Sequence, residues 1–441
     1  MKPPVGNDTG PGRGMDSPRS SSPFGNRDFC LLFSGSSISM IGDQFTLVAL
    51  PWLVLQLTGN PTQLGLVLAV MALPRAAFML IGGAVVDRMS PRWVLLTSRS
   101  ANAVLAGLLA ALVLAGGIRM WMVYSLAFGI GLSTAFAYPA GGSILPQIMA
   151  PNQLQGANSM IMGMRQLSML IGPALAGLLV TAGSGSGATV GASAQVHGTG
   201  LAFAVDAVSF LFSVASLLLI HISKERDSRA PPGGVFTQVI EGIRIVWQDA
   251  QLRSFVAYMA FVSVLVMGPL QVGLPLFAKL RFSEGAAAYG WLMTANGTGM
   301  LLGSVMSISV TRLVRGRLGL MILTLDGAAG LALAALTAVH TVPGGAALLV
   351  LTGLFAGTVQ IAIVTWLQRR VQQAVMGRIM SIVFFTFLGL APLAAALAGG
   401  LLKVISLNEL FIGAGLSLTT LATLCLTRPS LRAIRLQSAP A

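Results

Sequence analysis

Residues 29–57 read FCLLFSGSSISMIGDQFTLVALPWLVLQL, a mostly apolar run with one acid, Asp43, near its middle. About 20 apolar residues in a helix cross the hydrocarbon core of a bilayer, so this run predicts a membrane-spanning helix. A carboxyl group at the bilayer centre costs roughly 2.5 to 3.5 kcal/mol, so an acid there marks a functional site by default. Polar residues recur around Asp43 every three or four positions, and we expect this helical face to line a polar path. They are Ser36, Ser39, Asp43 and Thr46.

The composition is that of an integral membrane protein. Hydrophobic residues make up 55% of the chain and charged residues 9%, with a mean hydropathy of +0.81. The net charge of +14 is compatible with nucleic-acid binding, but basic residues of membrane proteins collect in cytoplasmic loops. The two cysteines, Cys30 and Cys425, lie near opposite ends of the chain, so neither a disulfide framework nor a metal cluster is expected.

Twelve apolar spans follow one another along the chain. They cover residues 29–57, 63–86, 93–116, 120–143, 158–182, 201–221, 253–277, 286–311, 318–340, 344–366, 378–401 and 408–426. Of the 27 Lys and Arg residues, 21 lie in tails, loops and span ends on the side of the N-terminus, and Arg99 is counted among them. This bias places both termini in the cytoplasm of a multi-pass protein of the cell inner membrane, and it leaves no need for a nucleic-acid partner.

The longest charged connection divides the spans into two sets of six. We expect a disordered cytoplasmic tail (1–28), an N-terminal half (29–222), a cytoplasmic linker (223–252), a C-terminal half (253–427) and a cytoplasmic tail (428–441). A weak internal repeat supports the division, since the loops after the second and eighth spans correspond. The predicted fold class is therefore an all-α membrane protein with twelve transmembrane helices in two six-helix halves, as in several secondary transporters.

The loop after the second span, GAVVDRMSPR at residues 83–92, resembles the loop signature of the major facilitator superfamily. The matching residues are Gly83, Asp87, Arg88 and Arg92. The chain departs from the signature at positions 90 and 91, where Ser and Pro replace a Gly and a basic residue. The resemblance implies a gating loop in which Asp87 caps or pairs with a neighbouring helix end. A solvated positively charged turn is the alternative.

The fifth span resembles the antiporter motif of the same superfamily, because small residues surround a Gly-Pro pair. They are Ser159, Ser168, Gly172, Pro173, Ala176 and Gly177. Small residues and a proline kink allow two helices to touch and pivot, and we expect Gly299 and Gly303 of the eighth span as the facing surface. Ordinary close packing explains the stripe equally well.

Several segments of the first six spans are similar to the drug:proton antiporter branch, typified by bacterial macrolide efflux proteins and the enterobactin exporter. They are IGDQ at 41–44, ALPW at 49–52, LTG at 57–59, PNQLQGAN at 151–158 and DAVSFL at 206–211. The resemblance implies export of a small molecule driven by proton entry.

Two charges lie midway along the first two spans and can meet at similar depth. We expect Asp43 to be the proton-coupling group and Arg75 its partner, since a buried pair costs less than two lone charges. Arg75 as an anchor for an anionic group of a substrate is one alternative, and a purely structural ion pair is another. Arg165, Asp206 and Asp326 are secondary intramembrane charges, for which a structural role is the stronger interpretation.

No reaction chemistry is visible. The three histidines have no metal-ligand spacing and no phosphate-binding loop is present, so we expect neither an enzyme, a metal nor a cofactor. Part of an apolar, adaptable substrate cavity is expected from five side chains. They are Ser39, Thr46, Tyr138, Phe384 and Phe387.

The sequence thus predicts a proton-coupled secondary transporter that exports amphipathic, drug- or macrolide-like molecules by alternating access. A siderophore or lysolipid carrier of the same fold is one alternative, and a transport-inactive membrane receptor is another. The expected partners are a small-molecule substrate, protons and the lipid bilayer, without nucleic acid and as a monomer.

Overall fold

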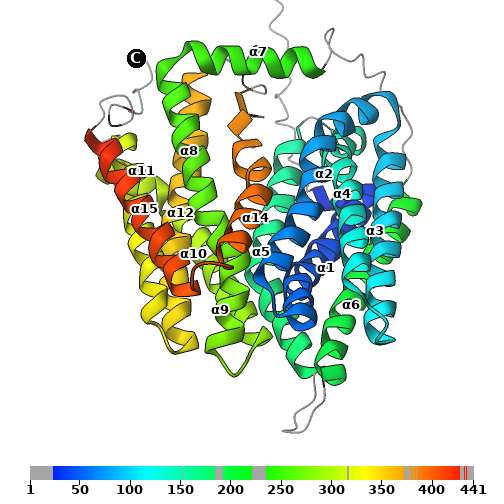
Figure 1. Ribbon diagram of the computed structural model, residues 1–441. Coiled ribbons are helices and arrows are strands. Elements are labelled where there is room, and N and C mark those ends of the chain that lie inside the picture. Colours follow the sequence, from blue (N-terminus) through cyan, green and yellow to red (C-terminus); the bar gives the residue numbers. More distant parts are fainter. Residues whose placement is uncertain are drawn as a thin grey trace, which may run out of the picture.

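The computed structural model describes residues 23–150, 152–183, 192–220, 235–314, 317–371, 376, 379–380, 382–383, 385–427, 432 and 434. The first set of helices is α1 (Arg27–Thr58), α2 (Pro61–Arg88), α3 (Pro91–Leu114), α4 (Met120–Ile148), α5 (Leu154–Ala182) and α6 (Ala192–Leu219). A helix at one end of the bundle, α7 (Val235–Gln248), precedes the second set (Figure 1). That set is α8 (Ala250–Gly268), α9 (Leu274–Arg281), α10 (Ala286–Leu313), α11 (Leu318–Ala335), α12 (Val342–Arg370), α14 (Ala391–Leu401) and α15 (Leu407–Thr427).

Local sequence signals explain where α1 begins and ends. The side chain of Asn26 accepts hydrogen bonds from the amides of Asp28 and Phe29, at 2.9 and 3.2 Å, and so satisfies two of the free N–H groups at the helix start. At the other end Gly59 adopts a φ of 61°, a left-handed conformation that glycine reaches without strain, and its amide bonds the carbonyl of Leu55.

The helices pack in two groups, which we call the N-terminal half (α1–α6) and the C-terminal half (α8–α15). In the first, α1 packs against α6 and α5, while α3 packs against α6 and α4. In the second, α12 packs against α10 and α11, and α11 packs against α15. Figure 1 shows the two groups side by side, with α5 and α14 near their boundary.

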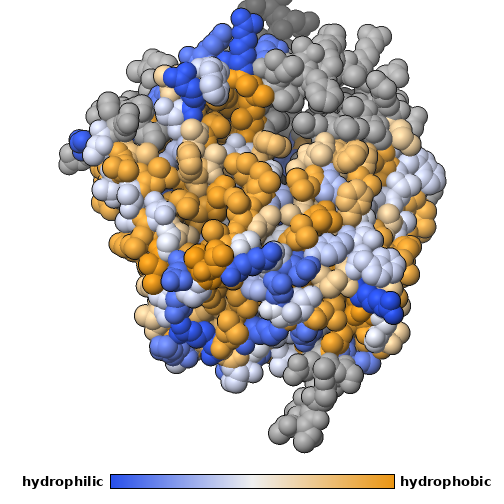
Figure 2. Space-filling view, viewed as in Figure 1, coloured by the Kyte–Doolittle hydropathy of each residue, from blue (hydrophilic) through white to orange (hydrophobic). Residues whose placement is uncertain are grey.

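Ten helices of the described chain are long and apolar enough to cross a membrane. The expected seventh span is one of them, but it is divided into α8 and α9 by a π-helical turn, Pro269–Gly273. The described part of the eleventh includes a second such turn, Phe385–Gly389, followed by α14. Figure 2 shows apolar side chains across the middle of one face, between polar groups near α7 and at the opposite end.

Two close contacts between described residues of the two halves lie toward the end of the bundle opposite α7, which we call the far end. A Cβ added to Gly65 on α2 would lie 2.4 Å from the carbonyl oxygen of Ala395 on α14. One added to Gly177 on α5 would lie 2.5 Å from the carbonyl oxygen of Ala286 on α10. Glycine therefore allows the backbones of the two halves to touch at two separate seams.

The prediction that Gly299 and Gly303 face the fifth span was wrong, because the glycines that do so lie at other positions of α10. Gly299 and Gly303 pack against α12, where added Cβ atoms would lie 2.1 and 2.0 Å from backbone oxygens. The glycines of α10 that face α5 are Gly290 and Gly297. Each helical position turns by about 100°, so a shift of two residues moves a side chain to a different face.

Candidate functional site

Asp43 lies inside the N-terminal half with three arginines around it. Its side chain is exposed rather than packed, and its carboxylate interacts electrostatically with Arg99 on α3, Arg165 on α5 and Arg75 on α2, in that order of strength. Among the described residues, one salt bridge has an N–O distance within 4.0 Å, and it joins Arg370 to Asp249. Asp43 and Arg75 therefore do not form a contact ion pair. In place of the expected pair, one acid lies among three guanidinium groups. We call Asp43, Arg75, Arg99 and Arg165 the Asp43 cluster.

Arg99 is the site residue that the sequence analysis missed. Its Nη1 donates to the hydroxyl of Ser39 at 2.7 Å, and its guanidinium lies 5.4 Å from the ring centroid of Phe210 on α6. Its Nε is buried and has no hydrogen-bond partner among the described residues. The position of Arg99, eight residues after the start of α3, was the one available signal that it belongs inside the bundle.

Ser39 and Thr46 do not lie on an open face with Asp43. Ser39 is fully buried and its hydroxyl is occupied by Arg99, while the hydroxyl of Thr46 donates to the carboxylate of Asp206. Both therefore serve the packing of α1 against α3 and α6. This placement differs from the expected substrate cavity, because buried hydroxyls take the nearest charged partners.

Asp206 belongs to the same cluster as Asp43, not to a separate site. It is 2% exposed, and its Oδ1 lies 2.8 Å from where a Cβ of Gly42 would stand. The hydroxyl of Ser209 lies only 1.9 Å from that position. Gly42 is thus the position that lets α6 approach α1 and brings the carboxyl group of Asp206 within electrostatic range of Asp43.

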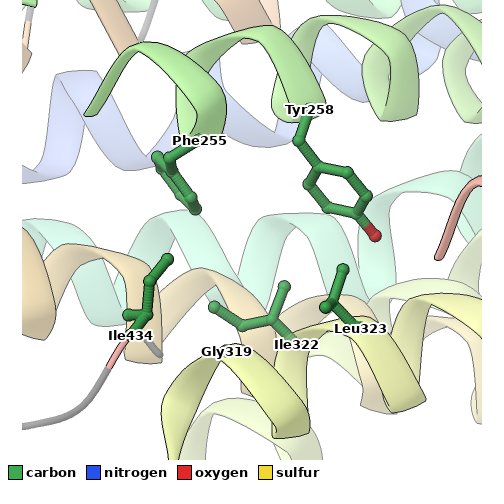
Figure 3. Close-up of a pocket in the computed structure, with 6 residues that line it drawn as sticks. All are labelled: Phe255, Tyr258, Gly319, Ile322, Leu323 and Ile434. Atoms are coloured by element: carbon green, nitrogen blue, oxygen red, sulfur yellow. The ribbon is translucent and has the colours of Figure 1, made fainter. Parts of the chain in front are cut away.

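Asp326 is separate from this cluster and lies in the C-terminal half. The hydroxyl of Tyr258 on α8 donates to its Oδ2 at 2.8 Å, and the carboxyl group is 7% exposed. Figure 3 shows Tyr258 beside a small pocket between α8 and α11, which Ile434 of the C-terminal segment also lines. The bond joins α8 to α11; a structural role for Asp326 stays a prediction.

The gating loop is described only in part. Gly83, Asp87 and Arg88 belong to helix α2, and their side chains lie outside the described part of the structure. Arg92 donates to the carbonyls of Leu217 and Leu218, at 3.1 and 2.9 Å. It therefore caps the end of α6, where free carbonyls favour a cation.

The antiporter-like residues of α5 contact two different helices. Ser168 donates to the carbonyl of Met40, and a Cβ at Gly172 would stand 2.4 Å from the side chain of Gln44. Pro173 and Gly177 instead face α10, since the carbonyl of Pro173 lies 2.3 Å from the Cβ position of Gly290. The motif thus packs α5 between α1 and the other half.

The aromatic residues predicted for the substrate cavity are not gathered at one place by any contact among the described residues. Tyr138 on α4 is 45% exposed and lies under the guanidinium of Arg165, 5.7 Å from its ring centroid. Phe387 is half-buried, and its carbonyl accepts a hydrogen bond from Ser263. Phe384 lies outside the described residues. Of this set, Tyr138 lies beside a charge of the Asp43 cluster.

Comparison with known proteins identifies the family. The profile of the Major Facilitator Superfamily matches residues 32–396, from α1 into α14. The chain belongs to the Major Facilitator Superfamily. It is therefore a multi-pass membrane protein and a secondary transporter of small molecules, not an enzyme.

Named relatives within the Major Facilitator Superfamily are distant. The chain is 27% identical over 412 residues to the multidrug efflux pump Tap of Mycolicibacterium fortuitum, covering 90% of this chain and 95% of that protein. It is 20% identical over 280 residues to macrolide efflux protein A of Streptococcus pyogenes, covering 63% and 65%. The crystal structure of a mutant of the nucleoside transporter NupG has a TM-score of 0.72 at 11% identity, covering 91% and 99%, and shares the fold.

Proposed function

We propose that this transporter is a proton-coupled exporter of amphipathic, drug- or macrolide-like molecules that works by alternating access. Its place would be the cell inner membrane, with α7 and both termini in the cytoplasm. The observation that carries the proposal is the exposed carboxyl group of Asp43 among Arg99, Arg165 and Arg75. The efflux named for the distant relatives supports the direction of transport.

The cluster offers a physical route to coupling. Protonation of Asp43 removes the negative charge that faces three guanidinium groups, so it changes the electrostatic attraction between α1 and helices α2, α3 and α5. A membrane potential supplies about 2.3 kcal/mol per charge per 100 mV, which is enough to drive such a cycle.

The experiment is transport in proteoliposomes that contain a pH-sensitive dye and carry an imposed proton gradient, with erythromycin and ethidium as probes. We expect Asp43→Asn to abolish gradient-driven probe flux and the matching proton flux. Asp326→Asn is the matched control, because it also removes an acid within the membrane. Asp326 lies in the C-terminal half, where its carboxylate accepts a hydrogen bond from Tyr258. It should retain most of the flux.

Other outcomes decide between the alternatives. Unchanged coupled flux in Asp43→Asn would reject the role of this residue. Binding of a probe without gradient-dependent flux in the parent would favour a transport-inactive receptor. Flux of a lysolipid or a catecholate siderophore, with none of either drug, would favour the carrier alternative.

A further inference from the structure

A basic residue of the C-terminal half bonds the end of a helix in the N-terminal half. Lys279, in the last turn of α9, donates from Nζ to the backbone carbonyl of Leu55 near the end of α1. The same carbonyl accepts the amide of Gly59 at 3.0 Å. The last carbonyls of a helix carry partial negative charge, so an ammonium group is favourable there.

Two other hydrogen bonds between described residues of the halves at the far end involve neutral groups. The hydroxyl of Thr62 donates to the carbonyl of Gly399 at 2.7 Å, and the amide of Ala287 donates to the hydroxyl of Thr181 at 3.0 Å. Charge-assisted hydrogen bonds are roughly twice as strong as neutral ones. The bond of Lys279 is therefore expected to be stronger than either of these two neutral links across the boundary.

A neighbouring residue separates this role from ordinary stabilisation of the fold. Arg281 lies on the same helix end, two residues after Lys279. It donates to the carbonyls of Thr337 and Val339, each at 3.1 Å, and to Asn408 at 3.0 Å, all in its own half. The C-terminal half is thus held together locally by Arg281, and Lys279 is left to bond across the boundary.

We infer that Lys279 is a positioning residue of the transport cycle, whose bond to the end of α1 holds the far end closed. Helices α1 and α9 belong to different halves, so the bond breaks when the halves separate at this end. It favours the conformation seen here over one that is open at the far end. A charged hydrogen bond present in one conformation and absent from the other shifts their ratio by about tenfold or more.

The test is a pair of distance measurements by spin labelling on the full chain in lipid nanodiscs, with Cys30 and Cys425 replaced by alanine. Labels at Leu57 and Val404, which are 36% and 82% exposed, span the far end. Labels at Met89 and Leu313, 56% and 82% exposed, span the α7 end. In Lys279→Met we expect the population with a long 57–404 distance to grow about tenfold relative to the closed one, while the 89–313 distance shortens.

Three control variants make the result specific. Lys403→Met removes a positive charge from an exposed position at the same end and should keep the parental distances. Lys279→Arg retains the charge and should also keep them. Lys279→Gln retains a donor without the charge, should shift the distances less than Lys279→Met, and carries the test if the methionine variant does not fold.

Two results would overturn the inference. Parental distances at both ends in Lys279→Met and Lys279→Gln would mean that the bond does not bias the conformation. A longer 57–404 distance with no change at 89–313 would mean local fraying of α1, not rocking of the halves. Neither measurement needs a substrate or a gradient, so the result does not depend on the proposed coupling to protons.

Discussion

The interiors of the two halves differ in charge. In the N-terminal half, helices α1, α2, α3, α5 and α6 each carry one charged residue of a single cluster around Asp43. In the C-terminal half, Asp326 is the one carboxyl group that the sequence places well inside a helix, and it is bonded by a tyrosine. We propose from this difference that the N-terminal half carries the coupling chemistry, while the C-terminal half provides a mainly apolar partner surface.

The helix packing of each half suits this division. On α1, Gly42 is the point where Asp206 and Ser209 approach closely, so the polar groups of two helices share one small volume. On α10, Gly303 instead meets the backbone of α12 at Leu354 and Thr358. Close helix approach thus serves a charged cluster in one half and backbone packing in the other.

The largest effect that would test this comparison is expected from Gly42→Ala. Its Cβ would stand 1.9 Å from the hydroxyl of Ser209 and 2.8 Å from the carboxylate of Asp206, so α6 must move away from α1. Because the closest atom stands at 1.9 Å, the overpacking should cost about 3 kcal/mol or more of unfolding free energy. Unfolding by titration with SDS in mixed micelles measures the loss, and gradient-driven flux should fall with it.

Two variants show whether the loss comes from this contact. Gly413→Ala on α15 adds a Cβ where nothing lies within 4 Å, so it should leave stability and flux near the parental values. The double variant Gly42→Ala with Ser209→Gly removes the closest atoms and should recover much of the stability. If the double variant is as unstable as Gly42→Ala alone, the close approach of α6 is not the cause.

An intermediate effect is expected from removing the hydroxyl donor to the buried acid in each half. Thr46→Val removes the donor to Asp206, and Tyr258→Phe removes the donor to Asp326. Each leaves a buried carboxyl group without its main partner, which costs about 1 to 3 kcal/mol. Both variants should lose similar stability in the same SDS titration, but gradient-driven flux should fall severalfold only in Thr46→Val.

Of the two measurements on these variants, the flux decides whether the halves have different roles. Equal loss of flux in both variants would mean that the two acids contribute alike, and the proposed division of labour between the halves would be wrong. Normal flux in Thr46→Val, with reduced stability, would restrict Asp206 to a structural role.

The membrane fold could be predicted from sequence because the signals are long and redundant. Apolar runs of the length of a bilayer predict the helices, and the family profile confirms the fold class. The two π-helical turns, Pro269–Gly273 and Phe385–Gly389, were not predicted. A single extra residue in a helical turn leaves the hydropathy of the span unchanged.

The site was predicted less well, because its contacts depend on helix rotation and depth. Asp43 was found from its depth alone, but Arg99 was counted among the cytoplasmic charges because it lies near the start of a span. Asp206 was predicted only as a secondary charge with a structural role and was not linked to Asp43, although Gly42 brings α6 onto α1 at that level. A shift of one or two residues along a helix decides such contacts, and hydropathy does not resolve it.

The smallest effect is expected outside the membrane-spanning part, at the start of the C-terminal half. The carboxylate of Asp249 caps α8 by accepting the amides of Gln251 and Leu252, at 2.8 and 3.2 Å, and it pairs with Arg370 at 2.7 Å. Burial raises the pKa of Asp249, but the hydrogen bonds from Arg370 and from these two amides outweigh it and leave the pKa below its usual value.

A carboxyl group with a lowered pKa in the folded state stabilises the protein above its unfolded pKa of about 3.9 and loses this contribution as the pH falls through the folded value. Asn also caps helices, so Asp249→Asn removes mainly the charge pairing. The side chains of the pair are 33% and 30% exposed, so this loss is only about 0.5 kcal/mol. Thermal unfolding should show a slightly lower Tm for the variant at pH 7 and a smaller difference at pH 3. A difference of equal size at both pH values would mean that the charge of Asp249 is not what ties α8 to α12.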